Sequence, residues 1–441
     1  MPRGFYTIMA AQFFSSLADN ALLIAAIALM AELSGPAWMT PLLKFFFTVS
    51  YVVLAPFVGA LADALPKGRV MFITNLLKIV GCMAMLFYEW ISFLLLQAYL
   101  PRLPEYVTVL AAYAIVGLGA AAYSPAKYGI LTELLPAKQL VLANGWIEGL
   151  TVASIILGVL LGGALISPMV SSALLGIEVP RVDTGIDTPA EAAILVIGAI
   201  YLVAAAFNLF IPDTGARYRR QHTNPVLLLS DFWGCFKTLW HDKLGQITLA
   251  VTTLFWGAGA TLQFLVLSWA ERHLRLPLSS GAVLQGVTAV GIALGAVLAA
   301  RYVPLKRSFS VLPVGVAMGF AVTLMAFVSA MPLVYLLLIA VGAMAGFFVV
   351  PMNALLQHRG HVLLSAGHSI AVQNFNENIS ILVMLALYSS MIALNLKVHA
   401  LVVIFGLFVA LTMMAVIQIH RRNQSKRDSL HLIGMEKHGH Q

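Results

Sequence analysis

Twelve long apolar stretches dominate the sequence. An α-helix needs about 20 residues to cross the hydrocarbon core of a bilayer, whereas a transmembrane β-strand needs about 10 and alternates in polarity. Hydrophobic residues make up 61% of the chain and charged residues 10%, while a water-soluble domain has about 25% charged residues. We therefore expect an all-α membrane protein with twelve transmembrane helices. The expected spans are 6–33, 40–63, 69–96, 105–130, 140–166, 190–212, 246–270, 279–303, 309–330, 332–356, 364–393 and 397–419.

The two halves of the chain share three similar segments, which occur in the same order. GALADALPKGR recurs loosely as GAVLAARYVPLKR, YSPAKYGIL matches VVPMNALLQ, and ANGWIE matches VQNFNE. Internal repeats of this kind are common in secondary transporters. They predict two pseudo-symmetric six-helix bundles. The expected domains are a first bundle at 1–212, a cytoplasmic linker at 213–245, a second bundle at 246–419 and a basic cytoplasmic tail at 420–441.

The distribution of positive charge predicts the orientation. Most of the 26 Lys and Arg residues lie in the linker, the tail and the loops that the expected spans place on the same side of the membrane. Because cytoplasmic loops are enriched in Lys and Arg, we expect both termini in the cytoplasm. The basic residues form no continuous stripe, so the net charge of +8 does not indicate nucleic-acid binding.

Within the linker, an amphipathic helix lying in the membrane surface is predicted by the helical spacing of Leu229, Phe232, Trp233, Phe236 and Trp240.

The first span carries an acid on a polar face. Gln12, Ser15, Ser16 and Asp19 recur at helical spacing, so they share one side of the helix, and Asn20 follows directly. A carboxylate inside a bilayer is unfavourable unless it faces a cavity or a partner, so an intramembrane acid marks a candidate functional site. We expect the other helices to build a cavity around this face, as in a carrier for a polar or amphiphilic solute.

Other spans carry polar groups that could line the same cavity. Tyr123 and Lys127 lie close together in the fourth span, and Lys127 is the one cation that we expect on a cavity-facing helix. The alternative for Lys127 is a side chain that extends to the membrane interface. Lys44, Lys78 and Glu89 lie nearer the ends of their spans and are expected at the interface. The candidate substrate-binding residues are Asp19, Asn20, Tyr123, Lys127, Gln263, Asn353, Asn374 and Glu377.

Two further acids lie within spans. Glu148 shares a helix face with Asn144 and Thr151, and Glu377 lies on a broad polar face of the eleventh span. Each acid could contact the substrate, or it could hold helices together through an ion pair or hydrogen bonds. We assign Glu148 to the structural role and keep Glu377 as a substrate candidate.

The loop after the second span contains Asp63, Lys67 and Arg69. An acid that ends one helix and a basic pair that opens the next can bond across the inner surface and hold one conformation. These three residues are therefore candidates for a gate, and the alternative is ordinary loop charge.

Motifs of known catalytic chemistry are missing from the sequence. It has no Gly-Lys pair, hence no phosphate-binding loop for ATP hydrolysis, and no His-Glu-x-x-His metal motif. Cys82 and Cys235 offer no framework for a metal site or a disulfide cluster. We expect a carrier without cofactor or metal, and not an enzyme. The alternatives are proton-coupled efflux of drugs or other amphiphiles through Asp19 or Glu377, an integral-membrane lipid enzyme, and a non-transporting scaffold.

One loop resembles the signature of the major facilitator superfamily, namely GALADALPKGR, with one extra residue between Asp63 and Gly68. Several segments are similar to the lysophospholipid transporter family: QFFSSLADNALL, APFVGALADALPKGRVM, GAAAYSPAKYGIL, LFWGAGATLQF, GFFVVPMNALLQ and AVQNFNEN. That resemblance implies Asp19, Lys127 and Glu377 as headgroup contacts. Relatives have an arginine on the seventh span where this chain has Gln263, so phosphate recognition is expected to shift to Lys127 or the headgroup range to differ.

The same resemblance implies a location, a substrate and a partner. A carrier of this family would lie in the bacterial inner membrane and move lysophospholipid, chiefly lysophosphatidylethanolamine, from the outer to the inner leaflet. It would work by facilitated flipping with alternating access, without ATP. An acyltransferase–acyl carrier protein synthetase would re-acylate the lipid on the cytoplasmic side. Membrane lipids are the other expected partners, no nucleic acid is expected, and we expect the carrier to act as a monomer.

Overall fold

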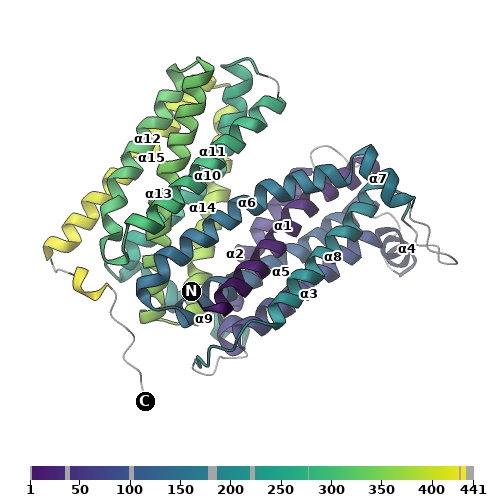
Figure 1. Cartoon of the computed structure of the whole chain (residues 1–441), viewed down its shortest axis with the longest axis horizontal. Coiled ribbons are helices and arrows are strands. Elements are labelled where there is room, and N and C mark those ends of the chain that lie inside the picture. Colours follow the sequence, from purple (N-terminus) through teal and green to yellow (C-terminus); the bar gives the residue numbers. More distant parts are fainter. Residues whose placement is uncertain are drawn as a thin grey trace. The chain divides into compact units, whose positions relative to one another are not determined.

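The computed structural model describes residues 2–34, 40–98, 104–176, 186–218, 224–276, 278–426 and 429–433. Every regular element within these ranges is an α-helix or a short 3₁₀ helix, and no strand occurs in them (Figure 1). Twelve helical segments are long and apolar enough to cross a membrane. The predicted all-α membrane fold with twelve spans is therefore confirmed.

The helices are labelled in chain order in Figure 1. Those before the linker are α1 (Arg3–Glu32), α2 (Thr40–Ala64), α3 (Lys67–Leu86), α4 (Tyr88–Ala98), α5 (Glu105–Leu134), η2 (Ala137–Gln139), α6 (Leu140–Leu165), α7 (Pro168–Leu175) and α8 (Pro189–Leu209). Those from the linker onward are α9 (Pro225–His241), α10 (Gly245–Arg272), α11 (Leu278–Tyr302), η3 (Leu305–Val311), α12 (Leu312–Leu324), η4 (Met325–Phe327), α13 (Met331–Leu363), α14 (Ala366–Ala393), α15 (Val398–Lys426) and η5 (Leu430–Leu432).

The third expected span, 69–96, differs most from the structure. Helix α3 ends at Leu86, and Phe87 leaves the helical conformation with φ −97° and ψ 30°, so the short helix α4 is a separate element. The ninth span consists of α12 with a 3₁₀ turn on each side. The short helix α7 was not expected, and residues 177–185 after it lie outside the described residues.

Two compact units make up the chain. The first consists of Met1–Leu54, Leu61–Lys127 and Ala153–Arg219, and the second of Ala55–Ala60, Tyr128–Val152 and Arg220–Gln441. The first part of α6 thus packs with the second unit and its remainder with the first unit. The expected boundaries of the two bundles, at 1–212 and 246–419, stay a prediction.

In the first unit, α1 packs along α8, and α3 packs against the same helix (Figure 1). The contact surface of α1 is built from small side chains, with Ala18, Ala21 and Ala25 fully buried. Helix α6 approaches α1 closely at Gly158 and Gly162, where a Cβ atom would lie 2.7 Å and 2.8 Å from backbone oxygens of α1. Small residues at four-residue spacing permit such close packing between membrane helices.

In the second unit, the main contacts join α11 to α13, α12 to α15 and α10 to α14. Gly291 of α11 and Gly342 of α13 face each other, since a Cβ atom on Gly342 would lie 3.1 Å from the Gly291 Cα. Two apolar clusters fill the interior of this unit, one around Trp269 and one around Phe348.

The linker contains the predicted amphipathic helix as α9, which begins after an Asn224 cap that accepts a hydrogen bond from the Val226 amide at 2.9 Å. Its aromatic face packs in part on the protein itself. The ring of Phe232 lies 5.3 Å from that of Phe375 on α14, and Trp240 donates to Asn376 Oδ1 at 3.3 Å. Four apolar residues of α9 stay exposed, namely Val226, Leu227, Leu229 and Trp233.

Candidate functional site

A buried ion pair joins α1 and α3 in the first unit. Lys78 Nζ lies 2.8 Å from Asp19 Oδ2. The Lys78 side chain is 1% exposed, whereas the Asp19 side chain is 19% exposed. The positive charge is therefore enclosed, and the accessible side of the pair is the carboxylate.

Hydrogen bonds from three helices complete the surroundings of this pair. Tyr201 of α8 donates its hydroxyl to Asp19 Oδ1 at 2.7 Å. Lys78 also donates to Ser15 Oγ at 2.9 Å, and Ser15 donates to Asn75 Oδ1 at 2.8 Å. A buried ion pair offsets the loss of hydration only when additional hydrogen bonds satisfy its charged atoms. Here both ions have a second polar partner.

Tyrosine rings cover the remaining side of the ammonium group. The Lys78 Nζ atom lies 5.0 Å from the centroid of the Tyr123 ring and 5.7 Å from that of the Tyr201 ring. Two buried donors beside the pair, the Tyr123 hydroxyl and the Asn75 Nδ2 group, have no hydrogen-bond partner among the described residues. Because a buried donor without an acceptor is unfavourable, these two groups are candidates for contact with a ligand.

The expectation that Lys78 lies at the membrane interface is wrong. It arises from the expected span 69–96, in which residue 78 stands nearer one end. Because α3 runs from Lys67 to Leu86, Lys78 lies close to the middle of the helix. Lys44 and Glu89 are exposed, and their interfacial position stays a prediction.

A glycine on α5 sets the approach of α5 to Lys78. A Cβ atom on Gly119 would lie 2.7 Å from Lys78 Cγ and 2.9 Å from the backbone oxygen of Thr74. Both distances are too short for a side chain. The absence of a side chain at Gly119 therefore lets α5 pack directly on the turn of α3 that carries the ammonium group.

Asn20 and Lys127 are the other substrate candidates in the first unit. Asn20 is half-buried, and its amide donates to the Ser16 backbone oxygen at 2.8 Å. Lys127 is half-buried on α5, one turn after Tyr123. Of the residues proposed from the sequence, the structure thus brings Asp19 and Tyr123 together, through Lys78.

In the second unit, hydrogen bonds connect three more candidates in a chain across α6, α13 and α14. Asn353 donates to Glu148 Oε1 at 3.1 Å. Gln373 donates from one Nε2 atom to Asn353 Oδ1 at 3.1 Å and to Glu377 Oε1 at 2.7 Å. All four side chains are buried. This chain joins three helices, as a structural role for Glu148 requires, and it also fixes the position of the Glu377 carboxylate.

Two neighbours support the same region. Asn144 of α6 and Gln357 of α13 exchange a pair of amide hydrogen bonds, each 2.9 Å long. Asn374 is buried on α14, and its backbone oxygen accepts from Asn378 at 2.8 Å. Gln263 differs from these residues, because its side chain is exposed on α10 and its backbone oxygen accepts a bond from Gln285 at 2.7 Å.

The loop between α2 and α3 contains a second buried ion pair. Lys67 Nζ lies 2.9 Å from Asp63 Oδ1 and donates to the Ala62 backbone oxygen at 2.6 Å. The same ammonium group lies 4.6 Å from the ring centroid of Tyr218, which follows α8. The candidate gate residues Asp63 and Lys67 are thus in contact, and Tyr218 connects them to the start of the linker.

Arg69, the third gate candidate, is exposed and lies near a different acid. Hydrogen bonds from the Arg217 side chain and the Gly215 amide lower the pKa of Asp213, and the positive charge of Arg69 also contributes. The Asp213–Arg217 pair is itself exposed. The structure therefore places Arg69 near the exposed Asp213–Arg217 pair.

A further ion pair was not predicted from the sequence. Arg359 of α13 bonds to both carboxylate oxygens of Asp242, at 2.9 Å and 2.7 Å, directly after α9. Asp242 also accepts from the Gly245 amide at 2.8 Å, at the start of α10. The pair fixes the end of the linker to the second unit.

Comparison with known proteins identifies relatives over nearly the whole chain. Residues 8–384 match the family model described as Major Facilitator Superfamily. The lysophospholipid transporter LplT of Yersinia enterocolitica is 40% identical over 401 residues, which cover 91% of this chain and 90% of that protein. The lysophospholipid transporter LplT of Yersinia pestis is 41% identical over 401 residues, which cover 91% of this chain and 89% of that protein.

Solved structures of the same fold are more distant in sequence. A bacterial homologue of the iron transporter ferroportin superimposes with a TM-score of 0.69 at 15% identity, covering 96% of this chain and 100% of that chain. The Escherichia coli fucose:proton symporter also gives a TM-score of 0.69 at 15% identity, covering 95% of this chain and 98% of that chain. At this identity the likeness concerns the fold alone.

Proposed function

We propose that this chain carries lysophospholipids across a membrane, because it belongs to the major facilitator superfamily and to its family of lysophospholipid transporters. The observation that supports this most is the 40% identity to such a transporter over 91% of the chain. Membership of this family also agrees with the expectation that the chain is a transporter and not an enzyme.

The Asp19 site suits the positive end of a phosphoethanolamine headgroup. The Asp19 carboxylate is 19% exposed beside its bonds to Lys78 and Tyr201, so an ammonium group can reach its accessible edge. We assign the amine to Asp19 and Asn20, and the phosphate to Lys127 and the unpartnered Tyr123 hydroxyl. Lys78 remains behind the carboxylate as its counter-charge.

In the second unit, we assign further headgroup contacts to residues of α10, α13 and α14. They are Gln263, Asn353, Asn374 and Glu377. The hydrogen bonds of Gln373 to Asn353 and Glu377 support this assignment for two of them, because they hold both side chains in place. Glu148 serves to brace α6 through Asn353. Asp63 and Lys67 form the gate that holds one conformation during alternating access, and Arg69 contributes charge at its exposed edge.

The proposal extends to the direction of transport, the membrane in which the carrier lies and the enzyme that uses its product. We propose that the carrier acts as a monomer in the bacterial inner membrane with both termini in the cytoplasm, as the positive loops predict. It would move chiefly lysophosphatidylethanolamine from the outer to the inner leaflet by facilitated flipping. There an acyltransferase–acyl carrier protein synthetase adds the second acyl chain, and this removal of product maintains the inward flow.

Reconstitution in liposomes tests the proposal. Lysophosphatidylethanolamine with a fluorescent acyl chain is placed in one leaflet, and a membrane-impermeant reductant measures how much remains outside. Vesicles with the protein should redistribute the lipid without ATP, and protein-free vesicles should not. If the lipid stays in its leaflet while a pH gradient drives export of a cationic dye, the chain is an efflux pump and the proposal is wrong.

A second experiment tests the partner and the direction. Labelled lysophosphatidylethanolamine added outside spheroplasts should be converted to the two-chain lipid only when both this carrier and the synthetase are present. Conversion at the same rate without the carrier would contradict inward transport by this chain.

A further inference from the structure

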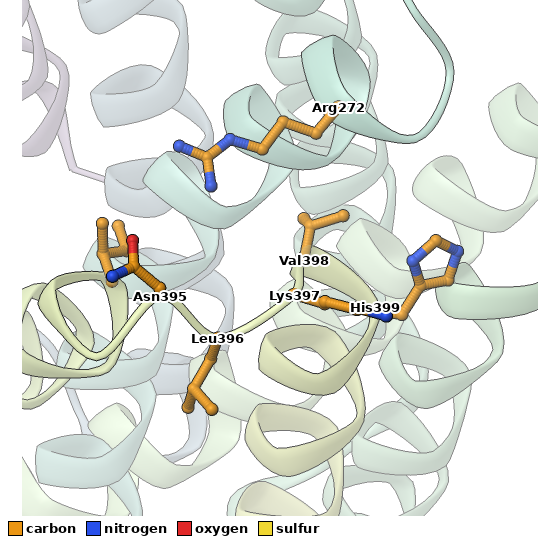
Figure 2. Close-up of a pocket in the computed structure, with 7 residues that line it drawn as sticks. Arg272, Asn395, Leu396, Lys397, Val398 and His399 are labelled. Atoms are coloured by element: carbon orange, nitrogen blue, oxygen red, sulfur yellow. The ribbon is translucent and has the colours of Figure 1, made fainter.

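A pocket of about 380 Å³ lies in the second unit, where α10 ends and the turn between α14 and α15 begins. Four polar side chains line it, those of Arg272, Asn395, Lys397 and His399. Figure 2 shows the Arg272 guanidinium and the Asn395 amide facing the same space, with Val398 beside them. None of the residues assigned above to headgroup transport lines this pocket, and the nearest of them in sequence, Gln263, lies nine positions before Arg272 on α10.

The charges around this pocket are all of one sign. Arg272 and Lys397 are cationic, His399 becomes so on protonation, and no acid lines the pocket. In the part of the chain that the structure describes, none of these three side chains forms an ion pair. Neighbouring like charges raise the free energy of the folded protein, and an anion bound between them would remove that repulsion.

The walls of the pocket are held in place by neighbouring contacts. The His399 ring lies edge-on to the His273 ring at 4.5 Å, and His273 in turn stacks on Trp269 at 5.8 Å. Asn395 has φ 55°, a left-handed conformation that asparagine tolerates, and its backbone N–H donates to the Ile392 backbone oxygen at 2.8 Å. These contacts hold the His399 ring and the Asn395 backbone in place before any ligand binds.

Exposed apolar residues occupy the C-terminal half of α14 and its C-cap Leu394, which directly precedes the pocket residue Asn395. Val383, Leu387 and Leu394 are exposed, and their spacing places them on one side of the helix. The ends of membrane helices lie at the depth of lipid headgroups, so an acyl chain on this strip would bring its phosphate to the pocket. Arginine and lysine side chains bind phosphate oxygens through charge-assisted hydrogen bonds.

We propose that Arg272, Asn395, Lys397 and His399 bind the phosphate of a membrane glycerophospholipid, whose acyl chain lies along Val383, Leu387 and Leu394. This site does not depend on the proposed transport of lysophospholipid, since it holds a resident lipid outside the Asp19 region. A free phosphate ion offers the same anionic oxygens, but it would gain nothing from the apolar strip.

Lipid binding to the purified full-length protein tests the site. Delipidated protein is titrated with phosphatidylglycerol, with diacylglycerol of the same acyl chains, and with glycerol phosphate, and native mass spectrometry counts the bound molecules. Phosphatidylglycerol should bind, whereas diacylglycerol, which lacks the phosphate, and glycerol phosphate, which lacks the chains, should bind at least tenfold more weakly, roughly as expected for losing one of two contact types. Equal binding of glycerol phosphate would show a free-anion site and overturn the proposal.

Two matched double variants localise the binding. The Arg272→Gln/Lys397→Gln protein should lose at least about tenfold in affinity for phosphatidylglycerol, since two charge-assisted contacts to the phosphate are removed. Arg275→Gln/Arg301→Gln changes the net charge equally at exposed residues outside the pocket and should keep its affinity within about twofold. Both pairs are exposed, so both proteins should fold, which thermal unfolding checks. The same affinity in both variants would contradict the site.

Discussion

Lys78 and Asp19 form a single structural unit, because they bond to each other, Tyr201 donates to Asp19 and Lys78 donates to Ser15. Loss of one partner leaves an uncompensated charge in the membrane interior. Replacement of both by neutral groups leaves none. Comparing the single variants with the double variant therefore separates the contribution of the pair to stability from the contribution of Asp19 to transport.

Asp19→Asn and Lys78→Met should each lower the free energy of unfolding by about 3 kcal/mol, as expected for breaking a buried ion pair. The double variant Asp19→Asn/Lys78→Met should regain most of this stability. If Asp19 binds the headgroup, the double variant should still flip lysophosphatidylethanolamine at least roughly tenfold more slowly, because the negative contact to the amine is gone. Thermal unfolding in detergent and the liposome assay give the two readouts. A stable double variant with full transport would show that Asp19 is structural only.

Close approach of helices α3 and α5 positions the ammonium group. The contact depends on Gly119, where even a methyl group would meet Lys78 Cγ and the Thr74 backbone oxygen. Gly163 on α6 offers a matched comparison, since a Cβ atom there meets no atom within 4 Å. The two glycines differ in their surroundings and not in their helical setting.

Gly119→Ala should separate α3 from α5, lower the free energy of unfolding by about 1–3 kcal/mol as overpacking does, and reduce transport. Gly163→Ala should be neutral or stabilise by up to about 1 kcal/mol, because alanine favours the helix. Thermal unfolding and flipping rates of both variants provide the comparison. If Gly119→Ala left both the free energy of unfolding and the flipping rate unchanged, the tight α3–α5 contact would be ruled out.

Sequence patterns predicted part of this arrangement well. The apolar runs located the spans, and the helical spacing of Ser15 and Asp19 identified the polar face that the ion pair occupies. Lys78 was misplaced because nothing in the apolar sequence around Phe87 marks the end of α3. Tyr201 was missed, since a lone tyrosine in an apolar span carries no polar pattern.

Pairings between distant residues were the least predictable feature. Arg359 and Asp242 are separated by 117 positions, and only folding brings them together. The gate motif shows the opposite case. Asp63 and Lys67 are four residues apart, so their contact could be foreseen, whereas the position of Arg69 near Asp213 could not.

Alternating access of the whole carrier requires inner contacts that form in one conformation and break in another. Asp63→Asn should therefore slow lysolipid flipping at least roughly tenfold while the protein still reaches the membrane, because Lys67 keeps its bond to the Ala62 oxygen and its contact with Tyr218. Arg69→Gln should have a smaller effect, since Arg69 is exposed. Immunoblots of membranes measure the amount of protein, and liposomes measure the rate. Undiminished flipping by Asp63→Asn would contradict the gate.

The pairing of Asp19 with Lys78 also has an electrical consequence. Work of about 2.3 kcal/mol is needed to move one elementary charge through a membrane potential of 100 mV. Because the ammonium and carboxylate groups lie 2.8 Å apart, they move as a dipole without net charge. Rearrangement of the first unit therefore exchanges little energy with the transmembrane voltage through these groups, and a zwitterionic cargo adds no charge of its own.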